Sequence, residues 1–456
     1  MVAPVRPAAS LPPGPRGPLL GTLVGPGRDP LALFTRFART YGDVVTFRIL
    51  GARAFLINHP DHIRDVLVTH QRNFTKSFAL ERAKRLLGNG LLTSEGATHL
   101  RHRRLLQPRF HRDRVAGYAS VMVEHADRLR GDWREGEQRD LSKDMMRLTL
   151  SIVAKALFDV DIESRADAVG RALTDVIESF WLTLLPLPRL IERLPVPVVR
   201  RAVAARAKLD SLIYEMIAER RATGDRGDLL SLLLTAQESE TEGGLTDAEI
   251  RDEAMTLLLA GHETTANAMA WTWHLLGTAP RVEAALHEQI DRVLGGRLPT
   301  IDDLPALGFV EQVVTESMRL YPPAWVIGRR AIADYPLGPY VVPARSLIFM
   351  SQWVMHRDPR YYEEPERFAP ERWTPAFKAS LPKFAYFPFG GGARQCIGEP
   401  FAWMELVLLV ATLAQHWAFR PVAGQPAVPK PLITLRPGNG VTMTLHRRNS
   451  VRAAVS

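Results

Sequence analysis

The chain has 456 residues, of which 46% are hydrophobic, and this composition suffices for a large buried core. Its single cysteine excludes an intramolecular disulfide framework and is typical of a reducing compartment, so we expect a cytoplasmic protein. The net charge of +9 is moderately basic, but the arginines are scattered and no helix-turn-helix, zinc or RNA-binding pattern occurs, so nucleic acid is not an expected partner.

The first 27 residues are rich in proline and glycine and contain no sustained apolar segment. Residues 1–27 are therefore expected to form an N-terminal arm that is neither a signal peptide nor a membrane anchor. The apolar stretch 180–199 is interrupted by four prolines and by charged residues, so it is not expected to span a membrane. Its part 184–199 is expected to pack on the neighbouring helices, with a lid over the substrate or a contact with a membrane surface as the alternatives. Because no linker or repeat divides the remainder, residues 28–456 are expected to form one domain.

The predicted elements begin with a helix capped by Asp29, with Pro30 in its first turn. Alternating apolar residues in 44–50 and 54–57 predict a hairpin, and a short helix is expected over 61–68. The stretch 71–96 has no clear period and is predicted to be irregular. Long irregular segments in compact domains are often functional.

A basic segment, His99 to Arg104, opens the next predicted helix, and on charge alone it reads as a solvated face. Apolar spacing then predicts a series of helices at 115–133, 141–158, 166–182 and 198–223.

A capping box at 246–249 predicts the start of a long helix that reaches about Gly277. Its middle contains Gly261, Glu263 and Thr264, although a glycine in a helix interior costs about 1 kcal/mol. Such a local violation suggests function, because small residues leave room for dioxygen or water and an acid beside a hydroxyl can relay protons. Taken alone, Glu263 is more often an ion-paired surface carboxylate.

Helices are predicted next at 280–294 and 302–320, then short strands at 339–342 and 346–350, and a terminal hairpin of 432–435 with 441–445. Within the second helix, Glu316 and Arg319 share a face. Such a pair is usually exposed and stabilises by only a few tenths of a kcal/mol.

The only cysteine, Cys396, lies in a glycine-rich loop, 387–398, just before an apolar run predicted to be a buried helix. Glycines let a flat ligand approach the main chain, and a helix N-terminus stabilises a thiolate. A thiolate in this position is a soft metal ligand. The alternative is an inert buried side chain, which is the common state of a lone intracellular cysteine.

The residues around the cysteine favour the ligand. Phe389, Gly392, Arg394, Cys396 and Gly398 match the haem-binding signature of the cytochrome P-450 family, and the chain resembles that family from about residue 12 to residue 445. The resemblance implies a mainly α fold with small β-sheets (α+β) and haem b between the long central helix and the cysteine loop. It makes Cys396 the iron ligand and Arg394 a partner of a haem propionate.

Further roles are implied by the resemblance alone. Propionate contacts are expected from His99, Arg103 and Arg329, with Arg330 as a competitor of the last, and proton delivery to dioxygen from Glu263 and Thr264. A buried triad of Glu316, Arg319 and Arg367 is expected to support the cysteine loop. The expected substrate pocket consists of Phe74, Phe78, Leu258, Ala260, Trp325 and Val326.

By this resemblance the protein is expected to be a monomeric monooxygenase that inserts one oxygen atom of dioxygen into an apolar small molecule, namely a fatty acid, terpenoid, steroid or polyketide. Because no flavin, nicotinamide or iron–sulfur motif is present, electrons are expected from a separate ferredoxin or flavodoxin and its reductase. The basic segment 101–114 offers a docking face for such an acidic donor. Three alternatives remain open: a haem-thiolate isomerase or lyase, a peroxygenase, and a non-catalytic haem sensor.

Overall fold

The computed structural model describes residues 11–15, 29–49, 51–184, 196–237 and 244–448. They form two compact units, each assembled from separate stretches of the chain. Unit 1 takes its described residues from Met1–Arg82, Ala324–Arg367 and Ala376–Cys396, and unit 2 from Ala83–Pro323, Phe368–Pro375 and Ile397–Ser456. That residues 28–456 act as one domain stays a prediction, as does the N-terminal arm, which lies mostly outside the described residues.

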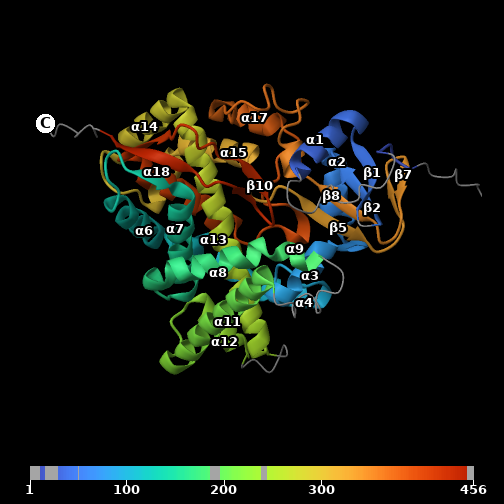
Figure 1. Ribbon diagram of the computed structural model, residues 1–456, viewed down its shortest axis with the longest axis horizontal. Coiled ribbons are helices and arrows are strands. Elements are labelled where there is room, and N and C mark those ends of the chain that lie inside the picture. The colour runs from blue at the N-terminus through green and yellow to red at the C-terminus, as the bar shows by residue number, and fades with distance from the viewer. Residues whose placement is uncertain (1–10, 16–28, 50, 185–195, 238–243, 449–456) are drawn as a thin grey trace, which may run out of the picture. The chain divides into compact units, whose positions relative to one another are not determined.

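Unit 1 is built on a five-stranded sheet with the order β1-β2-β8-β5-β3 (Figure 1). Its strands are β1 (Val44–Ile49), β2 (Ala52–Ile57), β3 (Phe74–Lys76), β5 (Ile327–Ala331) and β8 (Leu347–Met350). The predicted hairpin is confirmed as the antiparallel pair β1–β2, whereas β2 and β8 run parallel. A small hairpin of β6 (Tyr335–Leu337) and β7 (Tyr340–Val342) accompanies the sheet.

The helices of unit 1 are short. They are α1 (Pro30–Tyr41), α2 (Pro60–Arg64), a π-helical turn (Asp65–Thr69), a 3-10 turn (Gln71–Asn73) and α16 (Gln352–Met355), while α17 (Pro375–Ser380) begins at the last residue of a unit 2 stretch. The predicted cap of α1 is confirmed, because the Asp29 carboxylate accepts a hydrogen bond from the amide of Ala32 at 3.0 Å.

The expectation of irregular structure over 71–96 is wrong in part. The stretch contains β3 and the helix α3 (Phe78–Leu87). A three-residue strand has no detectable period in the sequence, and β3 exists because β5 pairs with it from far along the chain.

Unit 2 is mainly helical (Figure 1). Its helices are α4 (Gly96–Leu106), α5 (Arg112–Ala116), α6 (Ala119–Gly131), α7 (Leu141–Phe158), α8 (Ala166–Glu178), α9 (Phe180–Leu184), α11 (Pro197–Thr223), α12 (Leu229–Gln237), α13 (Asp247–Thr278), α14 (Pro280–Leu294), α15 (Gly308–Leu320) and α18 (Glu399–Ala414). The long helix α13 packs against α7, α15 and α18 and so runs through the core of this unit.

Several helix boundaries agree with the sequence because a capping group marks them. The predicted capping box of α13 is present, with the Thr246 hydroxyl and the Glu249 carboxylate each accepting a backbone hydrogen bond. The predicted helix over 115–133 is instead divided into α5 and α6, and the predicted helix over 302–320 is a 3-10 turn (Ile301–Ala306) followed by α15. The proposed lid lies mostly outside the described residues.

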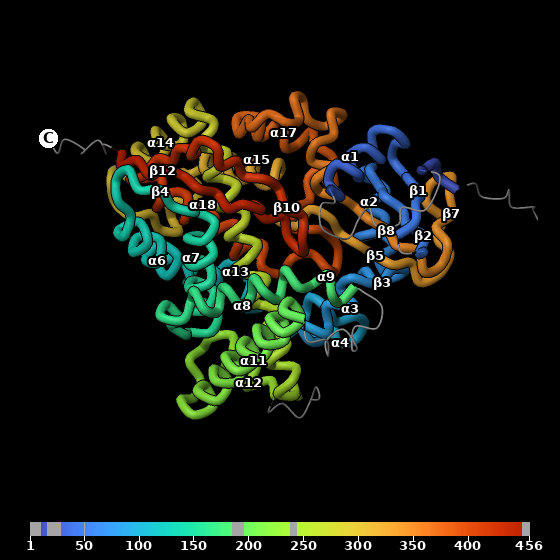
Figure 2. Tube along the Cα trace, viewed as in Figure 1, coloured from blue at the N-terminus to red at the C-terminus, as the bar shows by residue number. Residues whose placement is uncertain are grey.

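The predicted C-terminal hairpin is wrong. Strand β11 (Leu435–Pro437) pairs with β10 (Pro429–Pro431), whereas β12 (Thr442–Arg447) joins β9 (Trp417–Pro421) and β4 (Gln138–Asp140). Figure 2 shows β12 running beside β4. The turn between β11 and β12 reads like a hairpin loop in sequence, but the partner of each strand is set by long-range packing.

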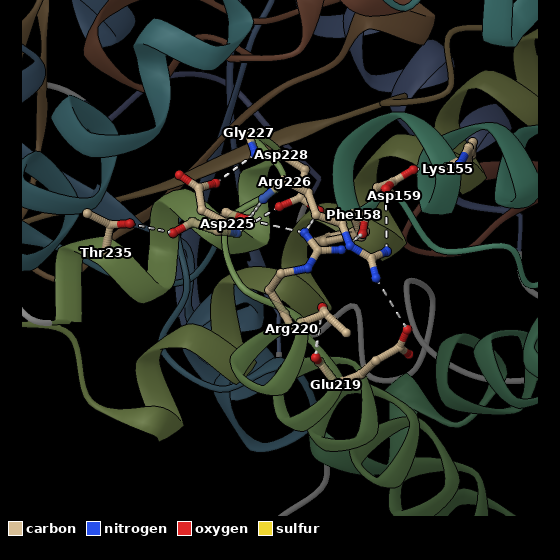
Figure 3. Close-up of polar contacts among 12 residues, drawn as sticks. Lys155, Phe158, Asp159, Glu219, Arg220, Asp225, Arg226, Gly227, Asp228 and Thr235 are labelled. Atoms are coloured by element: carbon tan, nitrogen blue, oxygen red, sulfur yellow. Dashed lines mark hydrogen bonds and ion pairs between the residues drawn. The ribbon is translucent and has the colours of Figure 1, made fainter.

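A buried arginine ties three helices of unit 2 together (Figure 3). Arg220 of α11 is paired with Asp228, and it donates to the Phe158 carbonyl at 3.0 Å and to the Ser231 hydroxyl at 3.1 Å. These contacts join the end of α7, the end of α11 and the start of α12. Within the described residues, no helix is both long and apolar enough to cross a bilayer.

Candidate functional site

The cysteine loop of unit 1 is closed by its own backbone. The Cys396 amide donates to the Phe389 carbonyl at 3.0 Å, and the Gln395 amide donates to the Gly392 carbonyl at the same distance. Between these two bonds a single 3-10 turn (Gly392–Arg394) carries the signature arginine. The loop therefore presents Cys396 from a fixed main chain.

Gly392 is required by both conformation and space. Its φ is +72°, which side chains rarely adopt, and an added Cβ would lie 1.9 Å from the Leu67 carbonyl oxygen. The next amide, that of Ala393, donates to the Gln71 side chain at 2.8 Å. The π-helical turn and the residues after it thus brace the loop, a role that the sequence pattern did not indicate.

A buried histidine fixes the start of the loop. His356 Nε2 accepts a hydrogen bond from the Phe387 amide at 3.0 Å, and the Tyr362 hydroxyl donates to the Ala385 carbonyl at 3.1 Å. Both side chains are fully buried in unit 1. The chain segment that leads into the loop is therefore held by side-chain hydrogen bonds, in addition to the backbone bonds that hold the loop itself.

Cys396 is exposed in unit 1, so it is not the inert buried thiol of the alternative interpretation. An exposed sulfur on a glycine-rich loop with a rigid backbone fits the axial ligand of a flat iron cofactor. In the chain, the sulfur precedes the first residue of α18 by three positions, as the apolar run predicted.

The structure separates the two competing arginines of β5. Arg329 is buried and Arg330 is partly exposed, with its guanidinium 3.8 Å from the Glu81 carboxylate. Arg394 of the loop donates to the Phe74 carbonyl at 3.2 Å. The burial of Arg329 favours it over Arg330 as the partner of an anionic group.

Helix α4 is not the solvated face that charge alone suggested. His102 is buried and its Nδ1 lies 2.5 Å from the Glu253 carboxylate of α13, while Arg101 pairs with Glu249 one turn earlier on that helix. His99 is also buried. The acidic partners of α4, Glu249 and Glu253, lie four residues apart on α13. This spacing was visible in the sequence but was not singled out.

The middle of α13 exposes a narrow strip. Ala260 is exposed and Thr264 is partly exposed, whereas most neighbouring residues of the helix are buried. The Thr264 hydroxyl donates to the Ala260 carbonyl at 2.7 Å, one turn back. Gly261 serves helix packing, because a Cβ there would lie 2.8 Å from the Val153 side chain of α7.

Glu263 is buried in an ion pair and is not a surface carboxylate. Arg436 of β11 donates to both of its oxygens, at 2.7 and 2.6 Å, and the Thr434 hydroxyl lies 2.5 Å from one of them. The acid and the hydroxyl expected to act together thus point to different faces of α13. No feature of the sequence singled out Arg436.

Two further ionisable groups lie near this point of the helix. Burial lowers the pKa of His262 to about 4, so its ring is neutral at neutral pH. Burial raises the pKa of Glu405 on α18 to about 8, and the nearby Thr265 hydroxyl offsets the rise only in part. Glu405, a lone acid in an apolar helix, was visible in the sequence but was not singled out.

The structure brings two members of the expected charge triad together in unit 2. Glu316 and Arg319 are fully buried and 2.8 Å apart. The other cation on Glu316 is Arg372, at 3.1 Å, and the Trp373 indole also donates to it, at 2.8 Å. Arg367 pairs with Glu364 and has a side chain that is 55% exposed, so it is not a member of a buried triad.

The six expected pocket residues divide into two groups. Phe74 belongs to the hydrophobic core of unit 1, with its ring 4.9 Å from that of Tyr335, so its assignment to a pocket is wrong. Leu258 and Trp325 are likewise buried. Exposed or partly exposed surface remains at Phe78, Ala260 and Val326.

Comparison with known proteins identifies the family of the chain. The family model described as Cytochrome P450 matches residues 11–443. Cyclooctatin synthase from Streptomyces melanosporofaciens is 40% identical over 424 residues, which cover 92% of each chain. Cyclooctat-9-en-7-ol 5-monooxygenase from the same organism is 41% identical and covers 89% of each chain. Pentalenene oxygenase from Streptomyces avermitilis is 35% identical over 86% of this chain and 87% of its own.

Among solved structures, the haem domain of cytochrome P450DA matches with a TM-score of 0.86 and 29% identity, covering 96% of this chain and 98% of that one. The predicted fold class is therefore confirmed, as are the haem cofactor and the reaction class. The chain belongs to the cytochrome P450 family and is a haem-thiolate monooxygenase that inserts one oxygen atom of dioxygen into an apolar small molecule.

Proposed function

We propose that the substrate is a cyclic terpenoid, the one of the four expected classes that its relatives favour. The observation that carries this proposal is the identity of two relatives, a cyclooctat-9-en-7-ol 5-monooxygenase and a pentalenene oxygenase. The exposed methyl group of Ala260 beside Thr264 supports it, because an apolar ring needs an apolar surface next to the reacting centre.

The cofactor is proposed to be haem b with Cys396 as its axial ligand, set in the loop of Phe389, Gly392 and Gly398. His99, Arg103, Arg329 and Arg394 are the proposed propionate partners, which the buried position of Arg329 supports. When bound, the haem activates dioxygen, and its thiolate ligand favours O–O cleavage. Glu316, Arg319 and Arg372 are proposed to hold the segment that leads to the loop.

Proton supply is proposed to run through Thr264 and Glu263. While the Thr264 hydroxyl donates to Ala260, its two lone pairs can accept hydrogen bonds, so it can hold a water molecule at the exposed strip. Glu263 supplies the exchangeable carboxylate one residue away. Electrons are proposed to come from a ferredoxin or flavodoxin that docks on the basic segment 101–114 of a cytoplasmic monomer, through its exposed residues Arg104, Arg112 and Arg114.

The test is a binding screen followed by turnover. Haem-loaded protein is titrated with cyclic terpenoid hydrocarbons, fatty acids, steroids and polyketides, and the iron spin-state change is recorded in the visible spectrum. Bound compounds are then incubated with NAD(P)H and a surrogate ferredoxin and reductase. We expect the largest spin-state change and a hydroxylated product from a cyclic terpenoid.

The same experiment separates the other functions. Product formed without electrons would indicate an isomerase or lyase, and equal turnover with hydrogen peroxide alone would indicate a peroxygenase. Haem binding without product from any class would indicate a sensor. A spin-state change confined to fatty acids or steroids would contradict the proposed substrate class alone.

A further inference from the structure

We propose that a polar cluster of Asp65, His70 and Tyr335 is a positioning device for the iron ligand. The polar cluster fixes the segment 65–74, and this segment in turn sets the shape of the loop that presents Cys396. The inference rests on the role proposed above for Cys396. It begins from the π-helical turn that opens the segment, because such turns are rare and are frequent at functional sites.

Segment 65–74 meets the 3-10 turn of the cysteine loop at each of its three residues. The contacts are the Leu67 carbonyl oxygen at the place that a Gly392 side chain would occupy, the Gln71 side-chain oxygen on the Ala393 amide at 2.8 Å, and the Phe74 carbonyl on the Arg394 guanidinium at 3.2 Å. The last of the three loop residues precedes Cys396 by only two positions. A change in the shape of the segment would therefore move the sulfur.

The polar cluster closes the π-helical turn through one carboxylate. The Tyr335 hydroxyl donates to one oxygen of Asp65, and His70 Nδ1 lies 2.6 Å from the other. Because a carboxylate oxygen accepts and does not donate, this ring nitrogen carries the proton. The His70 backbone amide also donates to the Asp65 carbonyl, at 2.9 Å. The two ends of the turn are thus joined by both main chain and side chains.

Tyr335 holds segment 65–74 at its first and last residues. Its hydroxyl binds Asp65, and its ring packs edge-on against Phe74, with the ring centroids 4.9 Å apart. Burial, and then the hydrogen bond to Asp65, raise the pKa of Tyr335 above its ordinary value, so its hydroxyl remains a donor. One side chain therefore fixes the distance between the start of the turn and the strand that holds Arg394.

Core packing alone does not account for the polar cluster. The ring of Tyr335 belongs to the hydrophobic core of unit 1, and a phenylalanine would fill that space equally well. The side chains of His70 and Asp65 are 51% and 29% exposed, so they add little apolar burial. What the three polar groups add is a fixed direction for the segment. Residues that orient a metal ligand in this way typically change metal affinity by about 10–100-fold when they are lost.

The test uses haem-loaded variants that remove one polar group at a time. Tyr335→Phe keeps the ring and removes the hydroxyl. His70→Leu removes the donor on Asp65, whereas His70→Asn places an amide nitrogen near the former position of Nδ1 and should restore the contact. The control is Tyr340→Phe, since Tyr340 lies on the other strand of the same hairpin and, among the residues that the structure describes, its hydroxyl makes no hydrogen bond.

The first readout is the lifetime of the thiolate Soret band in the reduced, carbon monoxide-bound protein. Tyr335→Phe and His70→Leu should lose this band about tenfold faster than the unaltered protein, because the loop no longer holds the sulfur in one place. His70→Asn and Tyr340→Phe should keep the unaltered lifetime.

The second readout is amide hydrogen–deuterium exchange, which locates the effect in the chain. Peptides covering 387–398 should exchange about tenfold faster in Tyr335→Phe, because a hydrogen bond to a charged group is lost beneath the loop. Peptides covering β1 and β2 report on the fold of unit 1 and should not change. If a variant does not load haem, the same comparison is made with the haem-free unaltered protein.

The outcomes separate this inference from the role of Cys396. A haem-loaded, unaltered protein without the thiolate band would refute that role and this inference with it. An intact band whose lifetime is the same in the unaltered protein, Tyr335→Phe and His70→Leu would overturn the role of the polar cluster alone. Faster exchange spread evenly over 387–398 and the two reference strands would also overturn it, because the polar cluster would then only stabilise the fold.

Discussion

At the scale of the residue, Thr264 differs from the other threonines in the middle of α13, Thr256, Thr265 and Thr272, by its partial exposure. Thr272 also bonds to the carbonyl four residues back, but it is fully buried and makes a second hydrogen bond to Ser317. Among the residues that the structure describes, Thr264 makes no such second bond, and it lies one turn from the exposed Ala260. A partly exposed hydroxyl can exchange protons with a bound water molecule, whereas a buried hydroxyl of the core can only support packing.

We predict that Thr264→Ala uncouples electron consumption from product formation. The variant removes the hydroxyl that holds the proton, so more electrons should end in hydrogen peroxide, and product per NAD(P)H should fall by about tenfold or more. The measurement compares product, peroxide and NAD(P)H in one reaction. Thr278→Ala, at the far end of the same helix, is the control, and unchanged coupling in Thr264→Ala would remove the proposed role.

We also predict that Gly392→Ala impairs haem loading. The added methyl group would collide with the Leu67 carbonyl, and its positive φ strains an alanine by about 1 kcal/mol or more. The matched control is Gly295→Ala, which has a positive φ at the end of α14 but nothing within 4 Å of the added Cβ. Haem content and urea midpoint should fall further for Gly392→Ala, and equal losses would mean that the collision with Leu67 is relieved.

These residues show which parts of the candidate site could be predicted from the sequence and which could not. Cys396, Thr264 and the cap of α13 were predicted because each belongs to a short local pattern with a physical cause. Arg436 and Arg372 were not, because each meets its carboxylate from a segment distant in sequence, and one arginine of an arginine-rich chain looks like another. Arg367 was expected in the triad from the resemblance alone, whereas the buried Glu316 contacts Arg372.

At the scale of the element, the segment 368–375 is held to α15 by a buried carboxylate. Glu316 accepts hydrogen bonds from the Ala369 amide at 3.0 Å and the Trp373 indole at 2.8 Å, in addition to its two arginines. One acid thus satisfies two side chains and the backbone of a short irregular stretch. Such a network tolerates the loss of a member poorly, because the remaining charges stay buried.

The prediction is that Arg372→Met destabilises the protein by about 3 kcal/mol, the lower end of the cost of breaking a buried pair, because Arg319 still faces Glu316. Arg367→Met is the control and should change stability by less than about 0.5 kcal/mol, since its pair with Glu364 is exposed. Urea unfolding of the two variants provides the measurement. Equal losses of stability in the two variants would indicate that Arg367 belongs to the buried charge triad.

The strand pairings were the part of the fold that the sequence predicted least well. The sequence 432–445 looks like a hairpin because a Pro-Gly-Asn-Gly turn separates two apolar runs. Instead β12 pairs with β9 and β4, and Gly440 in the turn lies so close to the Asp140 carboxylate that an added Cβ would be 2.7 Å from its oxygens. Competition with a distant strand decides such a pairing, and local turn signals do not report it.

At the scale of the whole molecule, the buried Glu405 should make the free energy of unfolding depend on pH. Burial raises its pKa from 4.5 to about 8, so between these values the folded protein binds a proton that the unfolded chain has released. The stabilisation from that proton is complete below about pH 4.5 and is lost as pH rises to about 8. The slope is up to about 1.4 kcal/mol per pH unit.

Glu405→Gln should therefore become more stable than the unaltered protein as pH rises from about 5 to 8, and the difference should then stay level. Urea unfolding at a series of pH values measures it. The exposed Glu288 on α14 supplies the control, since Glu288→Gln should show no such trend. A difference between Glu405→Gln and the unaltered protein that is constant over this range would contradict the burial of an isolated acid.

The central claim is that Cys396 is the thiolate ligand of a haem. The most direct test is the visible spectrum of the reduced, carbon monoxide-bound protein, with Cys396→His as the comparison at equal haem content. We predict the long-wavelength Soret band of a thiolate complex in the unaltered protein and its loss in Cys396→His. A fully haem-loaded protein without that band, or a Cys396→His variant that keeps it, would contradict the assignment.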